Sequence, residues 1–226
     1  MKSNIFLHFI TCCMVFLFSM NAHAEVLGEA EAIMFAETKG KELIDVFQEE
    51  NLSKRYQILD EMILEYIDIE HISKFLVGKY WRTMTKEQKE AYEKIFLRYG
   101  LALYKMLPLE YAKNIYYNIS GANIEGEYTN VLANVDFSLG SEVQKITVSF
   151  RLHKVAEKIK IVDVKVAESS LLLSYRGKFY EMIAQNDGEI EWFLEDLTDM
   201  AVSMEENLKQ KILHQQKSLE IDDKTI

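Results

Sequence analysis

The sequence is poor in cysteine, proline and glycine, with two cysteines, one proline and nine glycines in 226 residues. Cys12 and Cys13 both lie near the N-terminus, so the chain from residue 25 onwards contains no thiol. This excludes disulfides, thiol catalysis and thiolate metal ligands from that part of the protein. No low-complexity linker interrupts it, and about 200 residues suffice for one domain with its own core.

The motifs of common enzymes are also absent. The sequence has no His-x-x-x-His pair, no Gly-x-Ser-x-Gly turn and no glycine-rich phosphate loop. The three histidines after residue 24, at positions 71, 153 and 214, are scattered. Acidic residues outnumber basic ones, 36 to 26, so the net charge is -10. Nucleic-acid binding needs clustered Lys and Arg, so we expect no nucleic-acid partner. An acidic protein is also repelled by anionic lipid, so we expect membrane contact to run through protein partners.

No apolar run is long enough for a membrane span of roughly 20 residues. The longest, Ile5 to Met20, follows Lys2 and precedes the small-residue triplet Ala22-His23-Ala24. These three features predict a signal peptide over residues 1–24, cleaved after Ala24, and therefore export of residues 25–226. A retained membrane helix is the alternative. Lipidation at a cysteine is disfavoured, because no small residues precede Cys12.

Apolar residues follow helical spacing from Glu29 to Leu107 and predict four helices. The first includes Ile33 to Phe47, and the second runs to Ile67 with Ser53 as its N-cap. The third covers about 69–77 and ends at Gly78. The fourth begins after Thr85, which has the capping-box spacing with Gln88, and is stopped by Pro108.

After Pro108 the apolar period changes to two, which predicts a meander of four antiparallel strands. Two strands alternate over 131–139 and 145–152 and are joined by a turn at Gly140-Ser141. The others are expected near 113–120 and 158–166. The last strand carries apolar residues on both parities, so either a bulge shifts its register or helices cover both of its faces.

Helical spacing returns over 171–183 and, after Asp187-Gly188, over 190–204. The fold class predicted is therefore α+β: N-terminal helices, a four-stranded antiparallel meander sheet and C-terminal helices. The domain extends over 25–213, and the polar residues 214–226 are expected to form a frayed tail. Apolar residues make up 49% of the chain. They could fill a core or line a cavity, and periodicity alone does not separate these alternatives.

Two blocks resemble the MlaC family over about Ile33 to Leu197. The first is Leu76-Val77-Gly78-Lys79-Tyr80-Trp81-Arg82 followed by Thr85 and Gln88, and the second is Ile161-Val162-Asp163-Val164 followed by Ser170-Leu171 and Tyr175-Arg176. Ser174 stands where the family usually has Asn, and Ile159 where it usually has Trp. MlaC proteins, also called toluene-tolerance auxiliary proteins, are periplasmic phospholipid carriers of an ABC-type lipid transport system.

The resemblance implies a phospholipid pocket and no catalytic residue, cofactor or metal. Candidate lining residues combine the apolar side of the sheet with the inward faces of the helices: Leu76, Trp81, Phe96, Tyr99, Leu103, Val135, Phe137, Val148, Phe150, Ile161, Leu172, Tyr175 and Phe179. For each of them, ordinary core packing is the alternative. Arg176 could approach the lipid phosphate, although a structural ion pair is the favoured role.

The implied partners are an inner-membrane MCE-domain/ABC transporter complex and an outer-membrane lipoprotein complex, and the implied location is the periplasm. Three alternatives remain at this stage. The cargo could be a hopanoid-like lipid. The same scaffold could serve an exported enzyme, with His153 or Asp163 facing the pocket. The protein could also be an adaptor without cargo, which would have a filled core.

Overall fold

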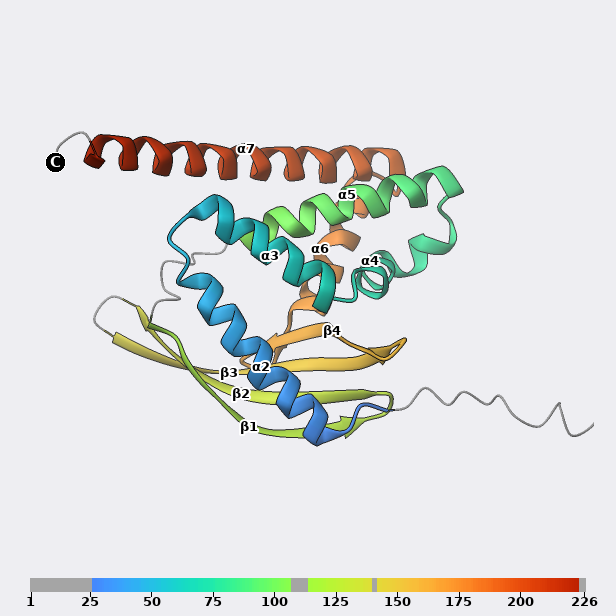
Figure 1. The fold of residues 1–226 in the computed structure, drawn as a ribbon. Coiled ribbons are helices and arrows are strands. Elements are labelled where there is room, and N and C mark those ends of the chain that lie inside the picture. The colour runs from blue at the N-terminus through green and yellow to red at the C-terminus, as the bar shows by residue number, and fades with distance from the viewer. Residues whose placement is uncertain (1–25, 107–113, 140–141, 224–226) are drawn as a thin grey trace, which may run out of the picture.

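The computed structural model describes residues 26–106, 114–139 and 142–223. The predicted signal peptide, Pro108 and the predicted turn at Gly140-Ser141 lie outside the described residues. An antiparallel sheet forms one layer, and the described helices lie on one side of it (Figure 1). The predicted α+β class is confirmed. No helix among the described residues is both long enough and apolar enough to cross a membrane.

The helices follow the predicted order. Their bounds are Glu29–Phe47 (α2), Leu52–Tyr66 (α3), Ile69–Val77 (α4), Lys86–Lys105 (α5), Leu171–Gln185 (α6) and Ile190–Asp223 (α7), with a short 3-10 helix over Gly78–Arg82. The capping box of α5 is confirmed, because Thr85 Oγ1 accepts from the Gln88 N–H while the Gln88 side chain accepts from the Thr85 N–H. For α3 the predicted cap is wrong. Asn51 Oδ1 accepts from the Lys54 N–H at 3.0 Å, and Ser53 lies inside the first turn.

The predicted end of α4 at Gly78 is confirmed, and a glycine is needed there. Its φ is +48°, a value that residues with a Cβ rarely adopt. A Cβ at this position would lie 2.4 Å from the Tyr180 hydroxyl and 2.8 Å from Arg176 Nη2. The turn after α4 therefore brings its backbone directly against α6.

The sheet is a meander in the order β1 to β5, with strands Tyr116–Glu125 (β1), Tyr128–Leu139 (β2), Glu142–Val155 (β3), Lys158–Val166 (β4) and Ser169–Ser170 (β5). It thus has one short strand more than the four predicted. In β4, Asp163 pairs with Arg151 and Ile161 pairs with Leu152, so Val162 is an extra residue in the ladder. This is one of the two predicted solutions, and the bulge turns Ile161 and Val164 toward the same face.

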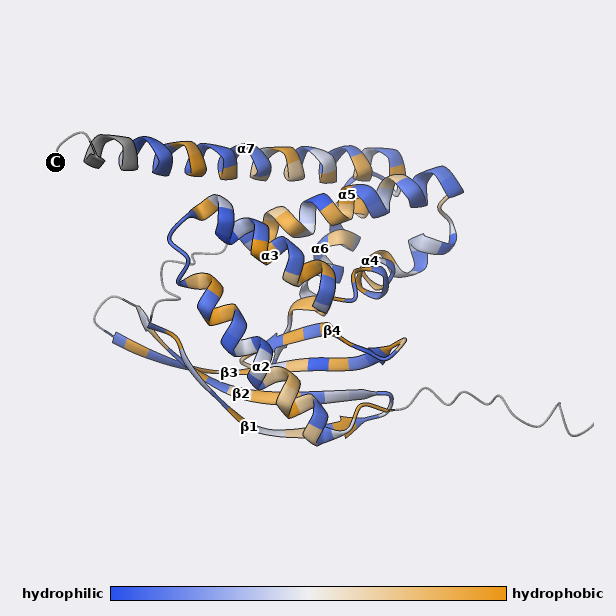
Figure 2. Cartoon of the chain, in the orientation of Figure 1, coloured by the Kyte–Doolittle hydropathy of each residue, from blue (hydrophilic) through white to orange (hydrophobic). Residues whose placement is uncertain are grey.

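The apolar core is divided into three clusters. The largest joins α4, α5, α6 and α7 around the buried rings of Tyr92, Phe179 and Phe193. A second joins α2, α3, α5 and α7 around Leu59. The third joins the start of α2 to the sheet around Leu152. Figure 2 shows apolar residues recurring along both the helices and the strands, as the predicted periodicities require.

The prediction of a frayed tail is wrong for residues 214–223, because α7 continues to Asp223. Figure 1 shows this helix as the layer farthest from the sheet. Near its end the Gln215 side chain donates to the Glu50 carbonyl at 2.7 Å and accepts from the Leu52 N–H at 2.9 Å. These bonds hold the end of α7 against the connection between α2 and α3.

Candidate functional site

A cavity of about 350 Å³ lies between the sheet and the first two helices, and we call it the sheet cavity. Its helical wall is mostly apolar and consists of Phe35, Ala36, Lys39, Gly40, Leu43, Ile44 and Phe47 from α2 and Leu59, Met62, Ile63 and Tyr66 from α3. Its strand wall consists of Tyr117, Ile119, Ala133, Val135, Phe150, Leu152, Ile161 and Val164. Alternate residues of the strands thus supply one wall and the inner face of α2 supplies the other.

A second cavity of about 180 Å³ lies among α4, α5, α6 and β4, and we call it the helix cavity. It is lined by Ile72 and Leu76 of α4, by Phe96, Tyr99, Gly100, Leu103 and Tyr104 of α5, by Leu171, Leu172 and Tyr175 of α6 and by residues 161–164. Ile67, Tyr104, Ile161 and Val164 line both cavities. The two hollows therefore adjoin and can hold parts of one guest.

Charged groups on these walls are already engaged. Lys39 Nζ lies 2.8 Å from a carboxylate oxygen of Glu42 and 4.6 Å from the centre of the Tyr66 ring. The hydrogen bond to Glu42 raises the pKa of Lys39, so it stays protonated and paired at neutral pH. The Asp163 carboxylate accepts from the Ser170 hydroxyl at 2.6 Å and from the Leu172 N–H at 3.0 Å. A guest therefore meets a surface that is largely apolar and nearly free of unpaired charge.

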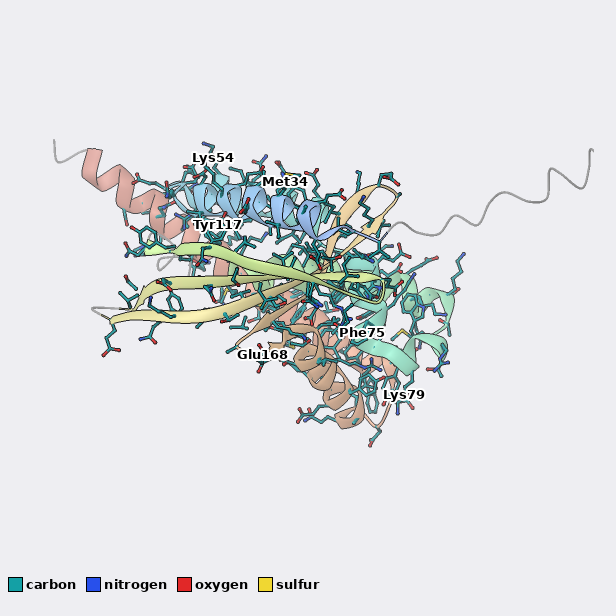
Figure 3. All side chains as sticks on the ribbon, turned by 90° about the horizontal axis from the view of Figure 1, so that it is seen from below. Met34, Lys54, Phe75, Lys79, Tyr117 and Glu168 are labelled. Atoms are coloured by element: carbon teal, nitrogen blue, oxygen red, sulfur yellow. The ribbon has the colours of Figure 1, made fainter. Side chains whose placement is uncertain are left out.

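Tyr117 of β1 packs against α2 and joins this helix to the sheet. Its hydroxyl donates to the Glu37 carbonyl at 2.6 Å, and Figure 3 shows Tyr117 alongside α2. The ring lies so close to Gly40 that a Cβ there would be 2.7 Å from it. Gly40 thus allows a tyrosine of β1 to lie against the helix backbone, where it also forms part of the wall of the sheet cavity.

Comparison with known proteins identifies the family. The family model for the MlaC protein matches residues 38–199, which include both cavities' main walls. The chain belongs to the MlaC family. It matches no relative among curated proteins.

A solved structure shares the fold of this MlaC family member. It is the phospholipid-binding protein from Ralstonia solanacearum, determined in complex with a phospholipid. The two chains are 17% identical with a TM-score of 0.63, and the match covers 76% of this chain and 98% of the other. The resemblance inferred from the two sequence blocks is confirmed by the family match.

Most of the candidate lining residues of this MlaC family member lie on the cavity walls. Leu76, Phe96, Tyr99, Leu103, Leu172 and Tyr175 line the helix cavity. Val135 and Phe150 line the sheet cavity, and Ile161 lines both. The structure therefore brings together residues from three helices and three strands that are up to about a hundred positions apart in sequence.

Four candidates lie elsewhere. Phe179 is completely buried, with its ring centre 5.6 Å from that of Phe193, because its turn of α6 faces α7 rather than β4. Trp81 packs edge-on against Tyr92 at the border of the same cluster. Val148 and Phe137 are on the helix-facing side of the sheet, as their parity predicted. Phe137 lies farther along β2 than Ala133 and Val135, which line the sheet cavity, whereas Val148 is buried beside Ala133, its partner in the ladder, without lining the cavity.

Arg176 is not on either cavity wall. Its guanidinium lies 4.5 Å from the centre of the Phe75 ring, and Nη2 donates to the Tyr180 hydroxyl at 3.2 Å. Figure 3 shows Phe75 and Lys79 near α4, at the end of the molecule away from Tyr117. Among the residues described, no carboxylate forms an ion pair with Arg176. In place of the expected ion pair, Arg176 stacks on aromatic rings, and its approach to a lipid phosphate stays a prediction.

The contribution of α2 and of Tyr104 to the cavity walls was not predicted from the sequence. Leu43, Ile44 and Phe47 were recognised as an apolar helix face, but not as a cavity wall. Tyr104 was not predicted either, although it lies on α5 directly after Leu103 and about one helical turn after Gly100. Within the described ranges, no group of three or more His, Cys, Asp or Glu side chains is placed to hold a metal ion.

Proposed function

We propose that this MlaC family member is a periplasmic phospholipid carrier. It is exported with a cleavable signal peptide and moves lipid between an outer-membrane lipoprotein complex and an inner-membrane MCE-domain/ABC transporter complex. The observation that carries the proposal is the pair of adjoining apolar cavities whose charged groups, Lys39 and Asp163, are both paired internally. The phospholipid bound in the Ralstonia protein of the same fold supports this choice of cargo.

The energetics of lipid transfer explain why such a hollow is needed. Two acyl chains of about 15 methylenes each cost on the order of 24 kcal/mol when exposed to water, at roughly 0.8 kcal/mol for each methylene. Spontaneous desorption through water is therefore very slow. A carrier removes that penalty by covering the chains with apolar walls, and the sheet cavity alone is within the roughly 300–1,000 Å³ range of ligand sites.

Covering acyl chains requires no nucleophile, base or metal. The two polar residues considered for an enzyme, His153 and Asp163, have hydrogen-bond partners within the protein. His153 is paired with Asp68 at 2.7 Å and is not part of either cavity wall. Asp163 lines the helix cavity, but its two carboxylate oxygens accept from Ser170 and from the start of α6. A carboxylate with both oxygens engaged in this way fixes the strand to the helix. Family and fold thus favour binding over chemistry.

The carrier proposal is tested by filling the helix cavity. Gly100 lies on its wall within α5, and a Cβ there would meet no atom within 4 Å. We expect Gly100→Leu to extend into the hollow and to lower the amount of co-purified phospholipid at least severalfold. Stability should rise by about 0.5–1 kcal/mol, because a helical glycine is removed. Organic extraction and native mass spectrometry measure the bound lipid, and thermal melts measure stability.

The matched control is Gly177→Leu, which replaces a helical glycine of α6 that is outside both cavities and equally uncrowded. It should retain lipid as the unmodified protein does. A protein that carries no phospholipid and takes none from vesicles would contradict the proposal. A hopanoid-like lipid in the extract would replace the cargo, and ester hydrolysis that disappears in Asp163→Asn would favour the enzyme.

A further inference from the structure

Three tyrosines place their phenol groups at the helix cavity. Tyr99 and Tyr104 come from α5 and Tyr175 comes from α6, and all three line the hollow. The tyrosine hydroxyls that bond another described residue include those of Tyr92, Tyr117 and Tyr180, and the three cavity tyrosines are not among them. The wall is otherwise built of aliphatic and aromatic groups and of Asp163, whose carboxylate is already hydrogen-bonded. Three tyrosines whose hydroxyls no described residue bonds thus line a largely apolar space.

Other tyrosine hydroxyls of this protein have an internal hydrogen-bond acceptor. The Tyr92 hydroxyl is buried in the core and donates to the Ser73 carbonyl at 2.8 Å. The Tyr117 hydroxyl donates to the Glu37 carbonyl at 2.6 Å. Buried polar groups in native proteins are normally hydrogen-bonded, because leaving them unpaired is costly. The hydroxyls of the three cavity tyrosines lack such an internal partner but are open to water or to a guest, since Tyr104 is 38% exposed and no tyrosine oxygen is among the described buried atoms without a partner. A guest that displaces this water must therefore offer an acceptor in its place.

The protonation of these groups suits donation. Burial raises the pKa of Tyr99 to about 12, and it also raises the pKa of Tyr104 and Tyr175. The nearby Tyr175 contributes a further rise for both tyrosines of α5. Each hydroxyl therefore keeps its proton at neutral pH and can donate a hydrogen bond, so the complementary group on the guest is an acceptor.

We propose that Tyr99, Tyr104 and Tyr175 form a site for the ester carbonyl oxygens of a diacyl lipid. The inference rests on the proposed function, since it assigns the polar part of that same cargo. Ester carbonyls are uncharged acceptors attached directly to the acyl chains, so they follow the chains into an apolar hollow. Hydroxyl donors from two helices can bond the two carbonyls of one glycerol backbone.

The charge of the wall selects the ester over the phosphate. No Lys or Arg lines the helix cavity, and the one ionisable acid on its wall is Asp163. A phosphate placed there would be desolvated near a carboxylate without a counter-ion, which is strongly unfavourable. The cation of the neighbouring sheet cavity, Lys39, is paired with Glu42. The headgroup of the cargo therefore remains outside the helix cavity.

The test compares ester-linked and ether-linked phospholipids that share headgroup and chain length, since the ether lipid lacks both carbonyls. We expect the unmodified protein to bind the ester lipid about five- to tenfold more tightly, measured by competition in native mass spectrometry. In the triple variant Tyr99→Phe, Tyr104→Phe, Tyr175→Phe the rings remain and the preference should disappear. If the triple variant folds poorly, the single variant Tyr104→Phe replaces it in the test, and it should reduce the preference for the ester lipid.

Tyr116→Phe is the matched control, because Tyr116 is largely exposed and outside both cavities. It should keep the full ester preference, and thermal melts of all variants should agree closely. Equal binding of the two lipids by the unmodified protein would overturn the ester site while leaving the carrier function standing. An ester preference that persists in the triple variant would also overturn it. Failure to bind either lipid would overturn the carrier function together with the site.

Discussion

At the scale of single residues, position along a strand separates cavity wall from ordinary sheet surface. Phe150 and Phe137 are both on the helix-facing side of the sheet, on neighbouring strands. Phe150 pairs with Val131 and Val164 and lines the sheet cavity, whereas Phe137 pairs with Gln144 and is half-buried beyond it. The two side chains share chemistry and face, but only one of them can contact a guest.

This difference predicts that a charged side chain affects lipid retention unequally at the two positions. In Phe150→Glu a carboxylate would enter the apolar hollow, and we expect phospholipid retention to fall by more than tenfold, since an unpaired charge is poorly accommodated beside acyl chains. Phe137→Glu should leave retention within about twofold, because that side chain has access to water and does not line the cavity. Lipid extraction and thermal melts of both variants measure the effects. Equal retention by the two variants would contradict the assignment of the wall.

Parity and helical spacing predicted which faces turn inward, and Leu76, Tyr175 and Ile161, chosen on that basis, line the cavities. The same rules also selected Phe179, because a helix face directed at a core and one directed at a hollow have the same period. The difference depends on which element lies opposite. For Tyr175 it is the bulged strand β4, and for Phe179 it is the packed helix α7. That information resides in tertiary packing.

At the scale of elements, local signals fixed most boundaries, and long-range contacts decided the rest. The capping box at Thr85 and the stop at Gly78 are contained within a few residues, so both were predictable. The length of α7 was not, because its polar end looks like a tail when read alone. In the structure Ile212 packs against the second apolar cluster and Gln215 bonds the backbone at both sides of Asn51. Tertiary contacts therefore extend the helix.

The role of Gln215 gives a prediction for α7. Gln215→Ala removes the acceptor for the Leu52 N–H, which belongs to the first turn of α3, and the donor to the Glu50 carbonyl. We expect a loss of about 1–2 kcal/mol in the free energy of unfolding, at roughly 1 kcal/mol for each net hydrogen bond. Chemical denaturation measures this loss. The neighbouring Gln216→Ala is the control, because that side chain is exposed, and equal stability of the two variants would contradict the bridging role.

At the scale of the whole molecule, the hollow occupies the region where the three apolar clusters fail to meet. The walls include Leu76 of the helical cluster, Leu59 of the second cluster and Leu152 of the cluster on the sheet. Each cluster stabilises its own part of the fold, so the space between them need not be filled for the protein to fold. This separates stability from guest binding, as the proposed carrier function requires.

Tyrosines with raised pKa values also give the whole molecule a characteristic response to alkali. Burial raises the pKa of Tyr92, Tyr99, Tyr104 and Tyr175 above the ordinary value of 10.0. Above about pH 10 the unfolded chain loses these protons while the native protein still holds them, so the native state binds more protons. The free energy of unfolding must then decrease as the pH rises.

We therefore expect stability to be constant up to about pH 10 and to fall steeply between about pH 10 and 12, with Tyr99 alone accounting for about 3 kcal/mol of the decrease at roughly 1.4 kcal/mol for each pKa unit. Tyr180 acts in the opposite direction, because hydrogen bonds from the Lys79 N–H and from Arg176 lower its pKa and favour its ionised form in the native state. One such group does not offset four. Denaturant titrations at successive pH values, with tyrosinate absorbance as a second signal, measure the slope. Tyr99→Phe should make it shallower, and a variant that keeps the full slope would show that the Tyr99 hydroxyl ionises equally in the folded and unfolded chains.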